Sequence, residues 1–189
     1  MHKGRLEAFS DGVLAIIITI MVLELRQPPG GDLAALGVAA PKLLIYLLSF
    51  VFIGIYWNNH HHMLQAAQRV TGGALWANMH LLFWLSLIPF VTDWMGEHFG
   101  AIPVAAYGIV LISAGAAYYI LSRVLLASHG PTSLLARALG RDVKGIASLV
   151  IYAVAVGVAL VAPWIACTLY VVVALLWLVP DRRIERLLS

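Results

Sequence analysis

Long apolar runs separated by short polar turns dominate the sequence, and their lengths predict membrane-spanning helices. A helix of about 20 residues, rising 1.5 Å per residue, matches the thickness of a bilayer's hydrocarbon core. The turns between the runs are rich in proline, glycine or charged residues, which do not continue a helix. We therefore predict one all-α integral membrane domain over residues 1–189, with six helices at about 5–25, 36–65, 74–95, 104–127, 145–161 and 164–179.

The first helix has two chemically different faces. At roughly 100° per residue, its apolar stripe consists of Phe9, Gly12, Ile16, Ile20 and Leu23, with Thr19 at the edge. Asp11 points away from this stripe. An acidic side chain inside a membrane helix is costly unless it faces protein or water, so Asp11 is a candidate functional residue. We expect the Asp11 side to hydrogen-bond with neighbouring helices.

The composition supports a membrane location. The chain is 62% hydrophobic and 11% charged, with a mean hydropathy of +0.92, whereas soluble domains are about 45–50% apolar and about 25% charged. Of the 12 Lys and Arg residues, only Arg26 and Lys42 fall on the side opposite the termini. The other ten are Lys3, Arg5, Arg69, Arg123, Arg137, Arg141, Lys144, Arg182, Arg183 and Arg186. By the positive-inside rule, both termini are expected in the cytoplasm.

The sequence carries no pattern typical of an enzyme or of a metal site. It lacks a nucleophile elbow, a phosphate-binding loop and a dinucleotide-binding glycine pattern. The consecutive His60, His61 and His62 fan over about 200° of a helix, so they cannot converge on one ion. We expect no catalytic residue, no cofactor and no metal site. Instead, His60 or His61 should join a polar network inside the bundle, while the other histidines face the cytoplasmic interface.

Motifs in the first three predicted helices resemble one known family. Arg5-x-x-x-Phe9-Ser10-Asp11, followed by Ile16, Thr19 and Leu23, is similar to the first-helix signature of the endosomal and lysosomal potassium-channel family, in its bacterial single-repeat branch. Four further motifs are similar to the second and third helices of this family. They are Tyr46-x-x-Ser49-Phe50, Trp57 with His60-His61, Asn78, and Pro89-Phe90-x-Thr92. The last three helices agree with the family only in number and hydrophobicity.

The resemblance implies a homotetramer of six-helix subunits in a bacterial inner membrane, in contact with lipid and permeant monovalent cations, with no nucleic-acid partner. The first helix of each subunit would line a central pore without a carbonyl filter. The implied constriction is at Ile16, with Thr19, Ile20 and Leu23 along the same wall. The residues implied to hold this helix in place are Arg5, Phe9, Ser10 and Asp11, with His60, His61 and Asn78.

An apolar constriction opposes ions because it offers no replacement for their hydration water. Potassium gives up its water more readily than sodium, so we expect a channel that prefers potassium modestly. Two other functions stay open. A proton-coupled transporter or proton-permeable channel would use Asp11 and the histidines, and an assembly protein would form the oligomer without conducting.

Overall fold

The protein was analysed as a computed structural model that describes residues 3–130, 132–139 and 142–178. All regular elements in these ranges are helices, which confirms the all-α prediction. They are α1 (Lys3–Leu23), α2 (Leu33–Ala66), α3 (Gly72–Ser86), α4 (Ile88–Glu97), α5 (Ala101–His129), α6 (Leu134–Leu139), α7 (Val143–Ala159) and α8 (Pro163–Leu178).

Four of the described helical stretches are long and apolar enough to cross a membrane: α1, α2, α5, and α3 with α4 as one stretch over Gly72–Glu97. The apolar helices α7 and α8 are shorter, at 17 and 16 residues. Helices of this length and apolar composition are typical of a membrane protein. We keep as a proposal that all six predicted helices cross the bilayer.

Two parts of the predicted helix pattern are corrected by the structure. The helix expected over 74–95 is divided at Leu87, because Pro89 has no N–H to donate to the preceding turn. The segment 128–144, expected to be a polar connector, contains the end of α5 and the short α6. The predicted end of the last helix at Val179 lies outside the described residues.

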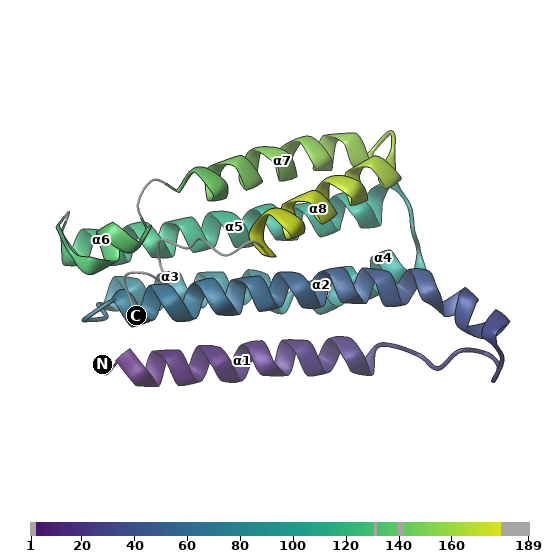
Figure 1. Ribbon diagram of the computed structural model, residues 1–189, viewed down its shortest axis with the longest axis horizontal. Coiled ribbons are helices and arrows are strands. Elements are labelled where there is room, and N and C mark those ends of the chain that lie inside the picture. Colours follow the sequence, from purple (N-terminus) through teal and green to yellow (C-terminus); the bar gives the residue numbers. More distant parts are fainter. Residues whose placement is uncertain (1–2, 131, 140–141, 179–189) are drawn as a thin grey trace.

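The helices form a bundle in which α1 occupies one edge (Figure 1). α1 packs against α2, α3 and α4, whereas α5 contacts α3, α4, α7 and α8 in the middle of the bundle. Large side chains such as Phe52, Tyr107 and Tyr170 are fully buried there. Gly108 lets α5 and α8 approach closely, because a Cβ at this position would lie 2.1 Å from the Tyr170 hydroxyl. Because α1 lies at the edge and packs on α2, α3 and α4, its other side has no neighbour among the described residues.

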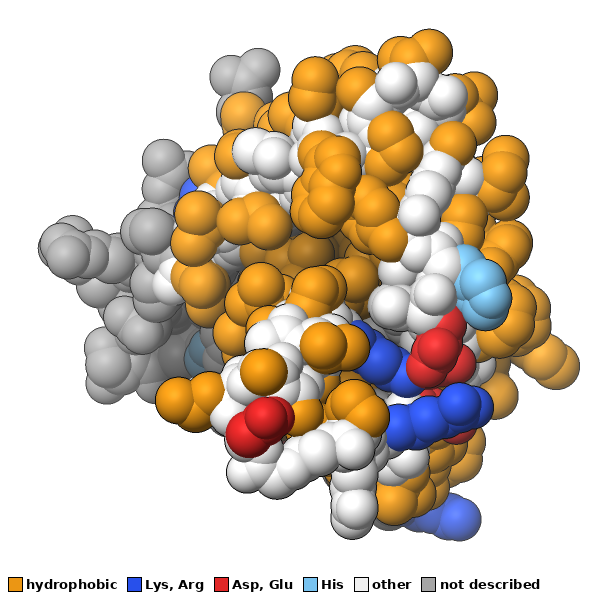
Figure 2. Space-filling view, turned by 90° about the vertical axis from the view of Figure 1, so that its right-hand side faces the viewer, with side chains coloured by type: hydrophobic (Ala, Val, Ile, Leu, Met, Phe, Trp, Pro, Cys, Tyr) orange, Lys and Arg blue, Asp and Glu red, His pale blue; other side chains and the backbone are white. Residues whose placement is uncertain are grey.

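The two ends of the bundle differ in charge as the sequence predicts. The beginning of α1, the α2–α3 turn, the end of α5 and the beginning of α7 lie at one end in Figure 1, and these segments carry most of the described basic residues. Arg141, Arg182, Arg183 and Arg186, also predicted for this end, lie outside the described residues. Figure 2 shows the opposite end, where a small group of basic and acidic side chains is surrounded by apolar ones. There the Lys42 Nζ lies 2.8 Å from Asp93 Oδ1 and 2.7 Å from Glu97 Oε1.

Candidate pore face and its supporting network

The apolar stripe of α1 is exposed in the single subunit. Ile16 is 58% exposed, Ile20 40% and Leu23 81%, although all three are large hydrophobic side chains. A Cβ added at Gly12 would meet no described atom within 4 Å, so the space beside this position of the stripe is also open. A continuous apolar face of this kind, left open on a membrane helix, is available to lipid, to another subunit or to a pore.

Thr19 adds a hydroxyl to the edge of this face. Its Oγ1 donates to the carbonyl oxygen of Ile16, 2.9 Å away, on the same helix. The hydroxyl oxygen keeps acceptor capacity, since a hydroxyl has one hydrogen and two lone pairs. Thr19 is exposed, so its hydroxyl combines a satisfied hydrogen with an oxygen that can still accept a hydrogen bond.

The opposite side of α1 is fixed by a buried polar chain across three helices. The Ser10 hydroxyl donates to the carbonyl oxygen of Leu6 at 2.9 Å, so it must act as the acceptor for the Asn78 Nδ2 at 3.0 Å. The Asn78 Oδ1 then accepts from the Nε2–H of His60 at 2.7 Å. Ser10 and Asn78 are fully buried, and His60 is 2% exposed.

The direction of these hydrogen bonds also sets the state of His60. With Nε2 as the donor, neutral His60 carries its proton there, and its Nδ1 becomes an acceptor. This Nδ1 is buried and has no hydrogen-bond partner among the described residues. The chain thus ends in one unsatisfied acceptor inside the bundle.

A second polar group joins α1 and α2 beside the buried chain. The Trp57 Nε1 donates to Asp11 Oδ1 at 3.1 Å, and the His61 Nδ1 lies 2.9 Å from Glu7 Oε1. The rings of Trp57 and His61 stack, with centroids 5.9 Å apart. On the other side of His61, its Nε2 lies 2.8 Å from the Gln65 Nε2, which fixes the His61 ring from both edges.

The structure brings together five of the seven residues suggested for the network around the first helix. Ser10, His60 and Asn78 share one hydrogen-bonded chain, while Asp11 and His61 are linked through other side chains. Arg5 and Phe9 are exposed instead, and the structure does not place them in either polar group.

Glu7 and Trp57 were missed as direct partners in this group. A signal for them exists, because Glu7 and Asp11 are four residues apart on one helix face, and Trp57 and His61 have the same spacing on the next helix.

A further buried polar group lies between α2, α4 and α5. The Ser49 hydroxyl is 2.7 Å from the Thr92 hydroxyl and 2.9 Å from the Tyr107 hydroxyl. Ser49 and Thr92 both belong to the motifs that carry the family resemblance. Their contact explains why hydroxyl residues occur at these positions in otherwise apolar helices: each satisfies the other within the bundle.

The acidic residues near the far end of α1 have different roles. Asp32 is the N-cap of α2, and its Oδ1 accepts from the backbone N–H of Ala35 at 2.9 Å. Glu24 is exposed. In the described part of the chain, no three His, Cys, Asp or Glu side chains are grouped so that they could hold a metal ion.

The fold and this site define a helical membrane protein whose first helix is anchored on one side by polar contacts and open on the other. Residues 5–89 match the family described as endosomal/lysosomal potassium channel TMEM175. A potassium channel of Chryseobacterium sp. is 52% identical over 190 residues, covering 100% of this chain and 99% of the relative. The chain belongs to this family.

Two further relatives extend the comparison. The crystal structure of a lysosomal potassium-selective channel TMEM175 homolog from Chamaesiphon minutus has a TM-score of 0.80 and 25% sequence identity, and it covers 93% of this chain and 95% of its own. A Bos taurus endosomal/lysosomal proton channel TMEM175 is 35% identical over 83 residues, which are 38% of this chain and 17% of that protein.

Proposed function

We propose that the protein is a potassium-preferring cation channel, assembled from four copies, whose pore is lined by α1 and narrowed by Ile16, Ile20 and Leu23. The observation that carries this proposal is the exposed apolar stripe of α1, opposite a face that is held by buried hydrogen bonds. The potassium-channel names of the bacterial relatives support the choice of ion.

The mechanism follows from the chemistry of this face. The side chains of Ile16, Ile20 and Leu23 recur at intervals of four and three residues, so four copies around an axis would form stacked apolar rings about one helical turn apart. Such rings supply no oxygen atoms to replace hydration water. Ions that lose water at lower cost pass more easily, which favours potassium over sodium.

Purified protein in liposomes under an outward potassium gradient tests this function. We expect potassium efflux at channel rates, with a smaller flux when sodium replaces potassium. Silent liposomes containing a well-formed oligomer would instead identify an assembly protein.

A proton-permeable channel or proton-coupled transporter is the second candidate. It is favoured by the proton-channel name of the bovine relative and by the titratable pair of Glu7 and His61 beside Asp11. Its membrane location would be the same: a bacterial inner membrane, with both termini in the cytoplasm. A pH gradient without potassium distinguishes the two, because only this candidate acidifies the liposome interior under that condition.

A further inference from the structure

The turn between α2 and α3 is attached to the end of α5 by one histidine. His129, the last residue of α5, has its Nε2 2.9 Å from the backbone nitrogen of Gln68 and 3.2 Å from that of Arg69. A backbone N–H group can only donate, so this Nε2 accepts both hydrogen bonds and carries no proton. The proton of the ring is then on Nδ1, which lies 2.8 Å from the Leu125 carbonyl oxygen. The attached turn therefore requires a neutral His129.

Arg69 adds a second contact between the same two segments. Its Nε donates to the Ser128 carbonyl oxygen at 3.0 Å, and its Nη2 donates to the same oxygen. The end of a helix leaves carbonyl groups without a partner in the helix, and this contact satisfies one of them. We call the hydrogen bonds from Gln68 and Arg69 to His129 and Ser128 the His129 latch.

A proton on the Nε2 of His129 is incompatible with this latch. A protonated imidazole has an N–H group at both ring nitrogens, so its Nε2–H would face the two backbone N–H groups instead of accepting from them. The Arg69 guanidinium would also lie near a second positive charge. His129 is partly exposed, so solvent protons reach it. Imidazole is the side chain that ordinarily changes charge between about pH 5 and 8, and this is the range in which the latch should open.

The segments that form the latch carry no acidic side chain that could stabilise a protonated ring. Over residues 67–86, α5 and α6, the charged side chains are Arg69, Arg123 and Arg137. The other imidazole of these segments is His80 on α3, whose Nε2 accepts from the Trp84 Nε1 at 3.0 Å. Charges within the latch segments therefore favour the neutral form of His129.

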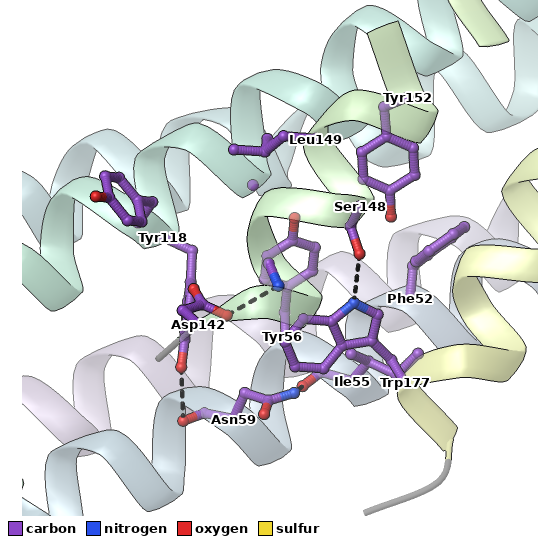
Figure 3. Close-up of a pocket in the computed structure, with 13 residues that line it drawn as sticks. Phe52, Ile55, Tyr56, Asn59, Tyr118, Asp142, Ser148, Leu149, Tyr152 and Trp177 are labelled. Atoms are coloured by element: carbon purple, nitrogen blue, oxygen red, sulfur yellow. Dashed lines mark hydrogen bonds between the residues drawn. The ribbon is translucent and has the colours of Figure 1, made fainter. Parts of the chain in front are cut away.

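The acidic side chains in the same half of the bundle have other partners. Glu7 lies beside His61, and Asp11 accepts from Trp57. Asp142 caps α7 at the wall of a cavity between α2, α5, α7 and α8 (Figure 3). The remaining basic side chains described in this half of α1, α2 and α7 are Lys3, Arg5, His60, His62 and Lys144. None of the three carboxylates makes a hydrogen bond or an ion pair with a residue of the latch.

The position of His129 at the end of α5 does not oppose release of the turn. A positive charge near the C-terminus of a helix is stabilised by the helix dipole. This stabilisation comes from α5 itself, so it is present whether or not the turn is attached. The N–H groups of Gln68 and Arg69, in contrast, face the ring only in the latched state. The difference between the two states therefore favours release once His129 is protonated.

We propose that His129 is a pH-sensitive latch, which holds the α2–α3 turn on α5 when neutral and releases it when protonated. The latched state binds one proton fewer, so its stability decreases as the pH falls. The turn follows directly on the end of α2, where the Lys3 Nζ donates to the Gln65 carbonyl oxygen at 3.2 Å. Release therefore also loosens the segment to which the beginning of α1 is attached. The latch uses no residue assigned to the pore or its supporting network, so its test needs no conduction and a failure leaves the channel proposal untouched.

Hydrogen–deuterium exchange of the purified full-length protein in detergent tests the latch at pH 7.5 and pH 5.5. Protection is the intrinsic exchange rate of an amide at each pH divided by its measured rate, which removes the direct effect of pH on exchange. We expect the protection of the Gln68 and Arg69 amides to fall roughly tenfold or more from pH 7.5 to pH 5.5, because both lose their acceptor. Residues 81–86 in the second half of α3 should keep their protection.

Three variants assign the effect to one side chain. His129→Gln is uncharged at both pH values and offers an amide oxygen near the place of Nε2, so the turn should stay protected at both. His129→Lys is charged at both and should leave the turn weakly protected at both. His98→Gln removes an exposed imidazole at the opposite end of the bundle, and the pH dependence of the native turn should persist.

The tautomer of His129 provides a second measurement that does not depend on a variant's stability. In the native protein with ¹⁵N-labelled histidine, NMR at pH 7.5 should show the His129 proton on Nδ1, and the ring should titrate together with the loss of protection. A proton on Nε2 at pH 7.5 would overturn the proposal, as would equal protection of Gln68 and Arg69 at both pH values. A pH-dependent loss that persists in His129→Gln would show that another group releases the turn.

Discussion

At the scale of single residues, the Ser10 hydroxyl makes the clearest prediction. Substituting Ser10 by Ala removes the acceptor for the buried Asn78 amide, which then has a hydrogen without a partner. Leaving a buried polar group unsatisfied costs roughly 1–3 kcal/mol. We expect a lower melting temperature of the solubilised protein, and the matched control is Ser86→Ala, which removes an exposed hydroxyl bonded only to the Phe83 carbonyl. Equal melting temperatures for the two variants would contradict the buried chain.

The sequence predicts which side of the first helix each residue faces, but it predicts only some of the residues that they contact. Helical periodicity separates Asp11 from the stripe, and the structure has Asp11 facing α2 rather than the open side. Asp11 accepts a hydrogen bond from Trp57 and not from a histidine. This choice depends on the axial register between α1 and α2. Tertiary packing sets this register, and no local pattern reports it.

At the scale of helices, Lys42 joins α2 to α4 through Asp93 and Glu97. Replacing Lys42 by Met keeps most of the side-chain length but leaves two carboxylates without their cation, so the contact between the two helices should weaken. Because all three side chains are partly exposed, salt screens this contribution. We expect a lower melting temperature at low ionic strength and a smaller difference from the native protein at high ionic strength.

Arg26→Gln is the matched control for Lys42→Met, because it removes a positive charge that acts on Glu97 from a distance and forms no ion pair within 4.0 Å among the described residues. A decrease in melting temperature of the same size in both variants would show that general charge balance, and not this ion-pair group, is responsible.

The positions of the helices followed from hydropathy more closely than their breaks did. The apolar runs indicate six helices. A proline within such a run, such as Pro89, does not by itself tell whether the helix bends, breaks or continues. In the structure the helix is divided at Leu87, where Pro89 cannot donate a hydrogen bond to the preceding turn. The short α6 was missed because a helix of 6 residues is too short to show a period.

At the scale of the whole molecule, the pore proposed along the open stripe of α1 requires other copies of the chain. A single apolar face cannot enclose a water path, and closed rings around an axis are the usual solution in homo-oligomers. We expect the solubilised native protein to have a protein mass of four chains of 20.5 kDa each, measured by light scattering with the detergent subtracted. A monomer or dimer that conducts normally after reconstitution would rule out the tetrameric pore.

The central claim, that Ile16 narrows the pore, is tested most directly by the reversal potential under bi-ionic potassium and sodium conditions. Asn in place of Ile16 supplies polar atoms in a similar volume and lets water remain in the ring. Ile16→Asn should therefore increase the basal current and bring the potassium-to-sodium permeability ratio closer to one. Ile146→Asn, at a position of α7 with a similar exposure of 54%, should leave the ratio unchanged. Native current and reversal potential in Ile16→Asn would show that the pore lies elsewhere.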